Sequence, residues 1–150
     1  MFHENSFVKI TDYGFSLEAK LMKELRPGDK LICYDPETLK PRNKPVAVKS
    51  TLKVTTLTKE LHTSTMDSIY IAIDSIFLST NGRWCMRDTS NYATFKLLKT
   101  GQGKPIKFTP TVRQVLPKGL GVFVDIRTEE DAWICVNNYI VFCKGLNSDG

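Results

Sequence analysis

Short apolar runs separated by turn residues recur along the whole chain, and this pattern constrains the fold more than any other feature of the sequence. The most apolar run covers residues 69–73 and continues at 76–78, and Asn81-Gly82 separates it from the run at 83–86. Asn-Gly between apolar runs is a strong hairpin signal because both residues tolerate positive φ. Turn signals return about every 8–12 residues, and no long stretch has helical periodicity. The sequence therefore predicts an all-β domain of antiparallel hairpins.

A corner is predicted between residues 21 and 35. Apolar residues at 21, 22 and 25 suit a single helical turn. Pro27-Gly28-Asp29 ends that turn because Pro lacks an amide donor and Gly adopts conformations that other residues resist. The apolar run at 31–34 is typical of a buried strand and ends at Asp35-Pro36. We expect a strand, a helical turn, a tight turn and a second strand in this order.

The length of 150 residues suits one domain with a substantial core, which we assign to residues 1–146, followed by a flexible tail at 147–150. Hydrophobic residues make up 41% and charged residues 25%, as in ordinary globular proteins. No apolar run approaches the ~20 residues that span a bilayer, and the first residues do not resemble a signal peptide. We therefore expect no membrane association.

The four cysteines are widely spaced and form no CxxC pair: Cys33, Cys85, Cys135 and Cys143. With only two histidines in the chain, a zinc site is not expected, and no motif indicates a cofactor. The pattern favours reduced, packed thiols in a cytoplasmic location.

The net charge of +5 permits nucleic-acid binding without requiring it. The 21 basic residues are interspersed with 16 acidic ones and form no block of five, which favours an ordinary solvated surface. The Thr- and Lys-rich segment 49–59 is the feature that supports a nucleic-acid-binding alternative. The glycines at 101 and 103 lack the spacing of a phosphate-binding loop.

Four sets of residues stand in a recognisable order along the chain. They are Val8-Lys9-Ile10-Thr11-Asp12-Tyr13-Gly14-Phe15; Leu25-Arg26-Pro27-Gly28-Asp29-Lys30-Leu31; Ala72-Ile73-Asp74-Ser75-Ile76-Phe77-Leu78 with Gly82-Arg83-Trp84; and Val124-Asp125-Ile126 with Val136-Asn137-Asn138-Tyr139-Ile140-Val141. In order and spacing they resemble the motifs of the Hint family, the shared fold of inteins and hedgehog autoprocessing domains. The resemblance covers residues 1 to about 144. It implies an all-β horseshoe of curved antiparallel hairpins with pseudo-two-fold symmetry.

The same resemblance implies a self-splicing chemistry that needs particular side chains. A Cys or Ser at the first position attacks the preceding carbonyl. A His in the motif that the third set resembles acts as general acid toward the scissile amide. A terminal Asn then cyclises through its side-chain amide with help from the His before it. A Cys, Ser or Thr follows that Asn.

None of these side chains stands at the matching position of this chain. The nucleophile position falls at or near Met1. The Thr and His of the motif that the third set resembles fall on Ala72 and Ser75, and the final His and Asn fall on Cys143 and Lys144. A thioether has no ionisable proton, and a lysine has no amide to cyclise. With Met1 as the true start, no residue would precede the first position. We therefore treat these five as degenerate family positions and assign no catalytic residue.

We expect a non-catalytic protein of this fold, retained as a protein-binding or structural module. Its protein partner is expected to contact the loops at 36–45 and 87–104. The family's presence in mobile DNA implies a phage-borne or mobile-element origin. Two alternatives stay open, namely an autoprocessing element that splices or cleaves itself and a nucleic-acid-binding module on the basic surface. The oligomeric state also stays open.

Several single residues have both a functional and a structural interpretation, and the structural one is favoured each time. Ser6 could serve as the nucleophile if the register shifted by five residues, but a Ser before a strand is typical of a turn. Cys143 has no nearby His in the sequence to lower its pKa, so we expect a packed thiol. His3 and His62 are expected in surface loops.

Two pairs of residues could also act on a ligand. Asp74 and Asp125 could form a carboxylate pair, but we expect them to cap turns at strand ends. Trp84 and Trp133 could stack on a base or ligand, but their apolar neighbours favour positions in the core.

Overall fold

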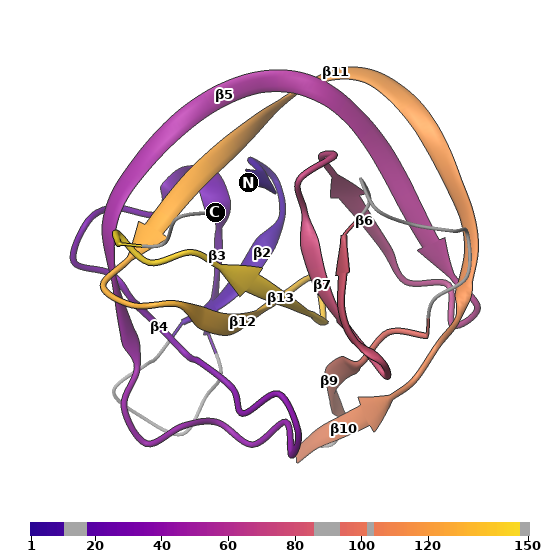
Figure 1. Cartoon of the computed structure of the whole chain (residues 1–150), viewed down its shortest axis with the longest axis horizontal. Helices are drawn as coiled ribbons and strands as arrows, with labels where there is room; N and C mark the ends of the chain where they lie inside the picture. The colour runs from indigo at the N-terminus through magenta and orange to yellow at the C-terminus, as the bar shows by residue number, and fades with distance from the viewer. Residues whose placement is uncertain (11–17, 86–93, 102–103, 148–150) are drawn as a thin grey trace.

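The computed structural model describes residues 1–10, 18–85, 94–101 and 104–147, and its regular structure is almost entirely antiparallel sheet (Figure 1). The strands are β1 (Phe2–His3), β2 (Phe7–Ile10), β3 (Glu18–Leu21), β4 (Lys30–Leu31), β5 (Val46–Thr63), β6 (Ser68–Ile71), β7 (Ile76–Ser79), β8 (Gly82–Cys85), β9 (Leu97–Gly101), β10 (Lys104–Phe108), β11 (Val112–Thr128), β12 (Ala132–Val136) and β13 (Tyr139–Cys143). A short 3-10 helix, η1 (Met22–Glu24), is the only helix in these ranges. The predicted all-β class is confirmed.

The strands of the described residues join into one 13-stranded sheet that curves around the core. Its main path runs β1-β11-β5-β4-β2-β12-β13-β7-β8. Off this path, β3 pairs with β2, β6 with β5, and β9 with both β10 and β13. Figure 1 shows β5 and β11 as a long arch over the molecule, with the hairpin of β12 and β13 crossing beneath it. The curvature encloses the apolar faces without a second layer of helices.

The arch differs from the sequence prediction at one point. Pro117-Lys118-Gly119 lies between two apolar runs and predicts a break between two strands. Instead, β11 continues through this segment, with Pro117 opposite Lys59 and Gly119 opposite Thr58, so that the register shifts by one residue. Gly119 has a φ of 76°, a conformation that glycine adopts without strain. The bulge absorbs both residues, and the predicted break was therefore wrong.

The predicted corner has the expected order of β3, η1, a tight turn and β4. Gly28 has a φ of 98°, and the Asp29 carboxylate accepts the Arg26 amide at 2.9 Å, which fixes the turn. Leu31 then pairs with both β2 and β5. The strand is shorter than the predicted 31–34, because Tyr34 forms only an isolated bridge after the chain leaves β4.

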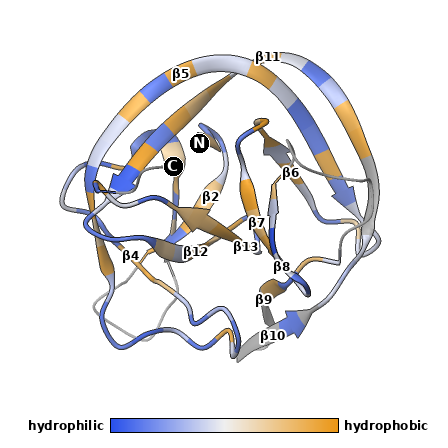
Figure 2. Ribbon diagram, in the orientation of Figure 1, coloured by the Kyte–Doolittle hydropathy of each residue, from blue (hydrophilic) through white to orange (hydrophobic). Residues whose placement is uncertain are grey.

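Aromatic side chains form the centre of the core. Phe95 is fully buried, and its ring centroid lies 5.0 Å from Trp84, 5.5 Å from Phe77 and 6.0 Å from Tyr139. Tilted and edge-to-face pairs at these distances are favourable beyond their burial. Trp84 is therefore a core residue, as predicted. Figure 2 shows apolar and polar residues interspersed along the arch. Several of the apolar ones are exposed there: Leu52, Leu57 and Leu120.

Some predictions fall outside the described ranges. These are residues 11–15 of the first family-like set, residues 87–93 and 102–103 of the expected partner loop at 87–104, and the last three residues of the tail. Within the described ranges, no helix combines the length and the apolar character needed to cross a membrane.

Candidate functional site

Three of the five degenerate family positions line a single hollow of about 100 Å³: Met1, Ser75 and Lys144. Met1 reaches it because β1 pairs with β11, and Ser75 lies in the turn between β6 and β7. Lys144 follows β13 directly, and β13 pairs with β7. The sheet thus brings residues from three distant parts of the sequence to one place. The other lining residues are Phe2, Asp74, Ile76, Asp125, Ile126, Arg127 and Phe142.

Ala72 and Ser75 close the turn between β6 and β7. The Ala72 amide donates to Ser75 Oγ at 3.0 Å, and the Ser75 amide donates to the Ala72 carbonyl at 3.1 Å. Ala72 is buried and does not line the hollow. Ser75 Oγ thus accepts a hydrogen bond within the turn. Its hydroxyl can still act as a hydrogen-bond donor toward the hollow.

Cys143 faces the core, because successive side chains of a strand point to opposite faces and its neighbours Phe142 and Lys144 line the hollow. Its Sγ donates to the Ile126 carbonyl at 3.7 Å and accepts the Thr128 hydroxyl at 3.9 Å. Burial raises the pKa of the Cys143 thiol to about 11. Such a thiol is a poor nucleophile near neutral pH.

Two carboxylates, Asp74 and Asp125, line the hollow. Oδ1 of Asp74 is buried, and within the described part of the chain it has no hydrogen-bond partner. Asp125 Oδ1 lies 3.9 Å from Nε of Arg127. Asp74 lies in a turn, as expected, whereas Asp125 lies within β11 opposite Leu52. The expectation that Asp125 caps a strand end was wrong because β11 is longer than its apolar residues indicate.

The hollow is balanced in charge, with two carboxylates facing Arg127 and Lys144. Its lining has neither an imidazole nor a thiol among the described residues. The carboxylates can accept or move protons, but no nucleophile stands beside a base in the way that covalent catalysis requires. Sequence reasoning missed Arg127, although its position two residues after Asp125 on one strand places both on the same face.

Both histidines lie in strands, which corrects the prediction that they are in loops. His3 is in β1, and its ring lies 4.8 Å from that of Tyr70. His62 is in β5 and forms a hydrogen bond with the Glu60 carboxylate. Ser6 lies in the tight turn after β1, where its amide donates to the His3 carbonyl at 3.0 Å. These positions arise from pairing with β6 and β11, which the polar sequence around each histidine does not indicate.

Within the described ranges, no group of three or more His, Cys, Asp or Glu side chains could hold a metal ion. Cys33, Cys85, Cys135 and Cys143 are all free thiols. The lysines of segment 49–59 are exposed along β5: Lys49, Lys53 and Lys59.

Neither a family model nor a curated protein sequence matches this chain. Solved structures of inteins do match it in shape. The Ssp DnaB mini-intein variant M86 has a TM-score of 0.79 at 14% identity, over 99% of this chain and 96% of that one. The DnaB intein of Synechocystis sp. PCC 6803 has a TM-score of 0.75 at 14% identity, over 95% and 97%.

The gp41-1 intein has a TM-score of 0.68 at 8% identity, over 93% of this chain and 95% of that one. Identities this low carry no information on activity, whereas near-complete coverage of both chains compares the whole architecture. The chain therefore has the all-β Hint fold of inteins, as the sequence motifs predict.

Proposed function

We propose that this chain is an intein-like domain that does not splice and that acts as a protein-binding module. The observation that supports the proposal is the set of side chains around the hollow, where Met1, Ser75 and Lys144 converge. Splicing needs a nucleophile, a general acid and a cyclising amide at these three positions. A thioether, a hydroxyl and an ammonium group supply none of the three.

The first two positions lack the required proton chemistry. The Met1 sulfur has no proton to lose, so it cannot form the ester or thioester that begins splicing. The Ser75 hydroxyl titrates far outside the physiological range, whereas an imidazole can donate a proton near neutral pH. Both deficiencies hold whether or not residues precede Met1.

The third position lacks the chemistry, and the chain beyond it is also held in place. The Thr128 amide donates to the Lys144 carbonyl at 3.1 Å, and the Leu146 amide donates to the Thr128 carbonyl at 2.9 Å. The Gly145 amide donates to Oδ1 of Asp131 at 2.8 Å. Two of these hydrogen bonds, from the Gly145 and Leu146 amides, therefore hold the chain just beyond Lys144 against the rest of the molecule.

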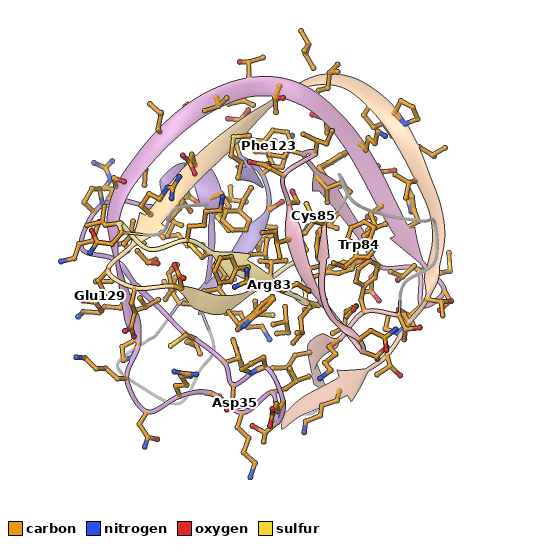
Figure 3. All side chains as sticks on the ribbon, in the orientation of Figure 1. Asp35, Arg83, Trp84, Cys85, Phe123 and Glu129 are labelled. Carbon is orange, nitrogen blue, oxygen red and sulfur yellow. The ribbon has the colours of Figure 1, made fainter. Side chains whose placement is uncertain are left out.

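The loop between Asp35 and Pro45 is the surface that we propose for the partner. Most of its residues are exposed, and the Asp35 carboxylate accepts the amides of Glu37 at 2.8 Å and Thr38 at 3.0 Å. Nζ of Lys96 also donates to a carbonyl in this loop at 3.1 Å. A loop that is already fixed by these hydrogen bonds loses little conformational entropy on binding, which favours high affinity for the partner. Figure 3 shows Asp35 at one edge of the molecule.

We also propose a reducing compartment such as the cytoplasm. The support is that all four cysteines are free and that Cys33, Cys135 and Cys143 are buried. Oxidising compartments favour disulfides, and buried thiols that pack as small hydrophobes are typical of reduced proteins.

A fusion with a folded domain on each end tests the loss of splicing. We expect it to remain intact on a denaturing gel with and without added thiol, while a DnaB mini-intein in the same fusion releases its flanks. Release of either flank by the native sequence would contradict the proposal and favour the autoprocessing alternative.

A pair of charge-matched variants tests the partner surface. The loop variant carries K40Q, R42Q and K44Q, and the control carries K49Q, K53Q and K59Q on β5. We expect the loop variant to lose a protein captured by the native chain and the control to retain it. Equal loss in both would point to unspecific charge, and a salt-dependent gel shift lost only in the β5 variant would favour nucleic-acid binding.

A further inference from the structure

A second hollow of about 250 Å³ lies beside the proposed partner loop. Its walls come from four separate parts of the chain, and six of its lining residues matter here: Arg42, Arg83, Glu130, Asp131, Trp133 and Phe142. Figure 3 shows Arg83 over the β12 and β13 hairpin near the centre of the molecule. A water molecule takes up about 30 Å³ in the liquid, so the hollow has room for roughly eight of them. That space is enough for one large side chain with an attached polar group.

One wall of this hollow is aromatic. Trp133 and Phe142 are opposite each other on β12 and β13, with ring centroids 5.4 Å apart in an edge-to-face arrangement. The Arg83 guanidinium lies 4.2 Å from the centre of the Phe142 ring. Trp133 is only partly buried, in contrast to Trp84, so its ring can contact a ligand. Trp133 still packs against a buried hydrophobic cluster, so both tryptophans belong to the core as expected, and Trp133 lies at its edge.

The two guanidiniums are available for an anion. Arg42 and Arg83 are both exposed, and neither forms an ion pair with a carboxylate of the described residues. Guanidinium groups bind planar anions through paired, charge-assisted hydrogen bonds. An aromatic wall beside two guanidiniums that have no ion pair within the described residues is suited to a ligand with a flat apolar body and an adjacent anion.

The acidic residues of the hollow select among anions. Glu130 and Asp131 also line it, and Oδ1 of Asp131 accepts the Gly145 amide. Two arginines and two carboxylates leave the hollow without net charge. A carboxylate with one negative charge is therefore favoured over a phosphate with nearly two, which the acidic side would repel.

We propose that this hollow binds the C-terminal residue of a partner protein, with an aromatic side chain against Trp133 and Phe142 and the terminal carboxylate on Arg42 and Arg83. The inference rests on the proposed function, because it names the partner feature that the adjacent loop would present to this site. In this arrangement the hollow recognises the C-terminal residue of the partner, and the loop at 35–45 contacts the partner around it.

Two matched small molecules test the inference on the full chain. N-acetyl-L-phenylalanine carries the ring and the carboxylate, and N-acetyl-L-phenylalaninamide carries the same ring without the charge. We expect the acid to shift the indole N–H signal of Trp133 in ¹⁵N-resolved spectra and to bind about tenfold more tightly than the amide. The Trp84 signal should not move, and a W133F variant assigns the two signals.

Variants separate the guanidiniums from the general surface charge. R42Q and R83Q should each reduce the affinity for the acid to that for the amide, whereas K40Q, in the same loop but outside the hollow, should not change it. R83K retains the charge over Phe142 and should lose only part of the affinity. Near-ultraviolet circular dichroism checks that each variant is folded.

Equal affinity for acid and amide, equal losses in K40Q and R42Q, or no binding of either compound would each overturn the inference. Displacement of the acid by inorganic phosphate more readily than by acetate would also overturn it. The fusion experiment is independent of these titrations. A spliced fusion with intact acid binding refutes the proposed function alone, and an inert fusion without acid binding refutes this inference alone.

Discussion

The reactivity of Cys143 toward iodoacetamide at pH 8 measures whether the family position is chemically inert. Burial raises its pKa from 9.0 to about 11, and alkylation proceeds through the thiolate. Two pKa units reduce the thiolate population about a hundredfold at this pH. The thiol is also only 1% exposed, so steric protection adds to the effect. We therefore expect labelling at least about a hundredfold slower than for an accessible thiol.

Cys85 is the internal reference, because its side chain is partly exposed and its Sγ donates a hydrogen bond to the Ile73 carbonyl at 3.7 Å. Timed labelling followed by peptide mass spectrometry gives a rate for each cysteine in one sample. In 6 M guanidinium chloride the rates should converge. Labelling of Cys143 as fast as Cys85 in the native protein would refute the reasoning, because it would reveal an accessible or activated thiol.

Three further predictions concern stability, each measured by urea unfolding. Stability should fall between pH 9 and pH 11, because burial raises the pKa values of Cys135 and Cys143 to about 11 and the unfolded chain releases protons that the folded chain retains. Each thiol contributes about 2–3 kcal/mol to this loss, and a C135A/C143A variant should lack only their share of it. Burial also raises the pKa values of Cys33, Tyr34 and Tyr139, so a smaller fall in the same direction should remain. Phe95→Ala should cost about 3–5 kcal/mol because it empties the aromatic centre, whereas Leu57→Ala on the exposed face should change stability by less than about 0.5 kcal/mol. Gly145→Ala should cost about 1–3 kcal/mol, because a Cβ there would lie 2.8 Å from the backbone of the neighbouring turn, and unchanged stability would show that this segment is not anchored.

The fold was largely predictable because its signals are local. Apolar runs, the turn signal at Asn81-Gly82 and the 27–29 turn each depend on a few neighbouring residues, and β7, β8 and β4 follow from them. The turn itself lies at residues 80–81, one residue before the predicted pair, and Gly82 begins β8 opposite Ser79. The continuous course of β11 was not predictable in this way. Pro117 and Gly119 break most strands, and only the pairing with β5 makes a bulge more favourable than a turn there.

The five positions that the resemblance names are only partly brought together, because Ala72 and Cys143 do not line the hollow. The resemblance named Met1, Ser75 and Lys144, and these residues share one hollow. The second hollow was not foreseen, because Arg42 and Arg83 are exposed charged residues that look ordinary in sequence. Their proximity depends on the path of the chain from β4 to β8 and on the register of the β12 and β13 hairpin, which bring them beside Trp133.

The arch of β5 and β11 has a consequence for biosynthesis. It pairs residues 46–63 with residues 112–128, so β5 must wait for about fifty intervening residues before its partner leaves the ribosome. At roughly 5–20 residues per second, the wait lasts roughly 3–10 s. During it, the edge of an 18-residue strand that later pairs with β11 has no partner, and an unpaired strand edge is a site for aggregation and proteolysis. Nascent chains that end before residue 112 should therefore remain protease-sensitive, and compaction should come late and in one step when β11 emerges.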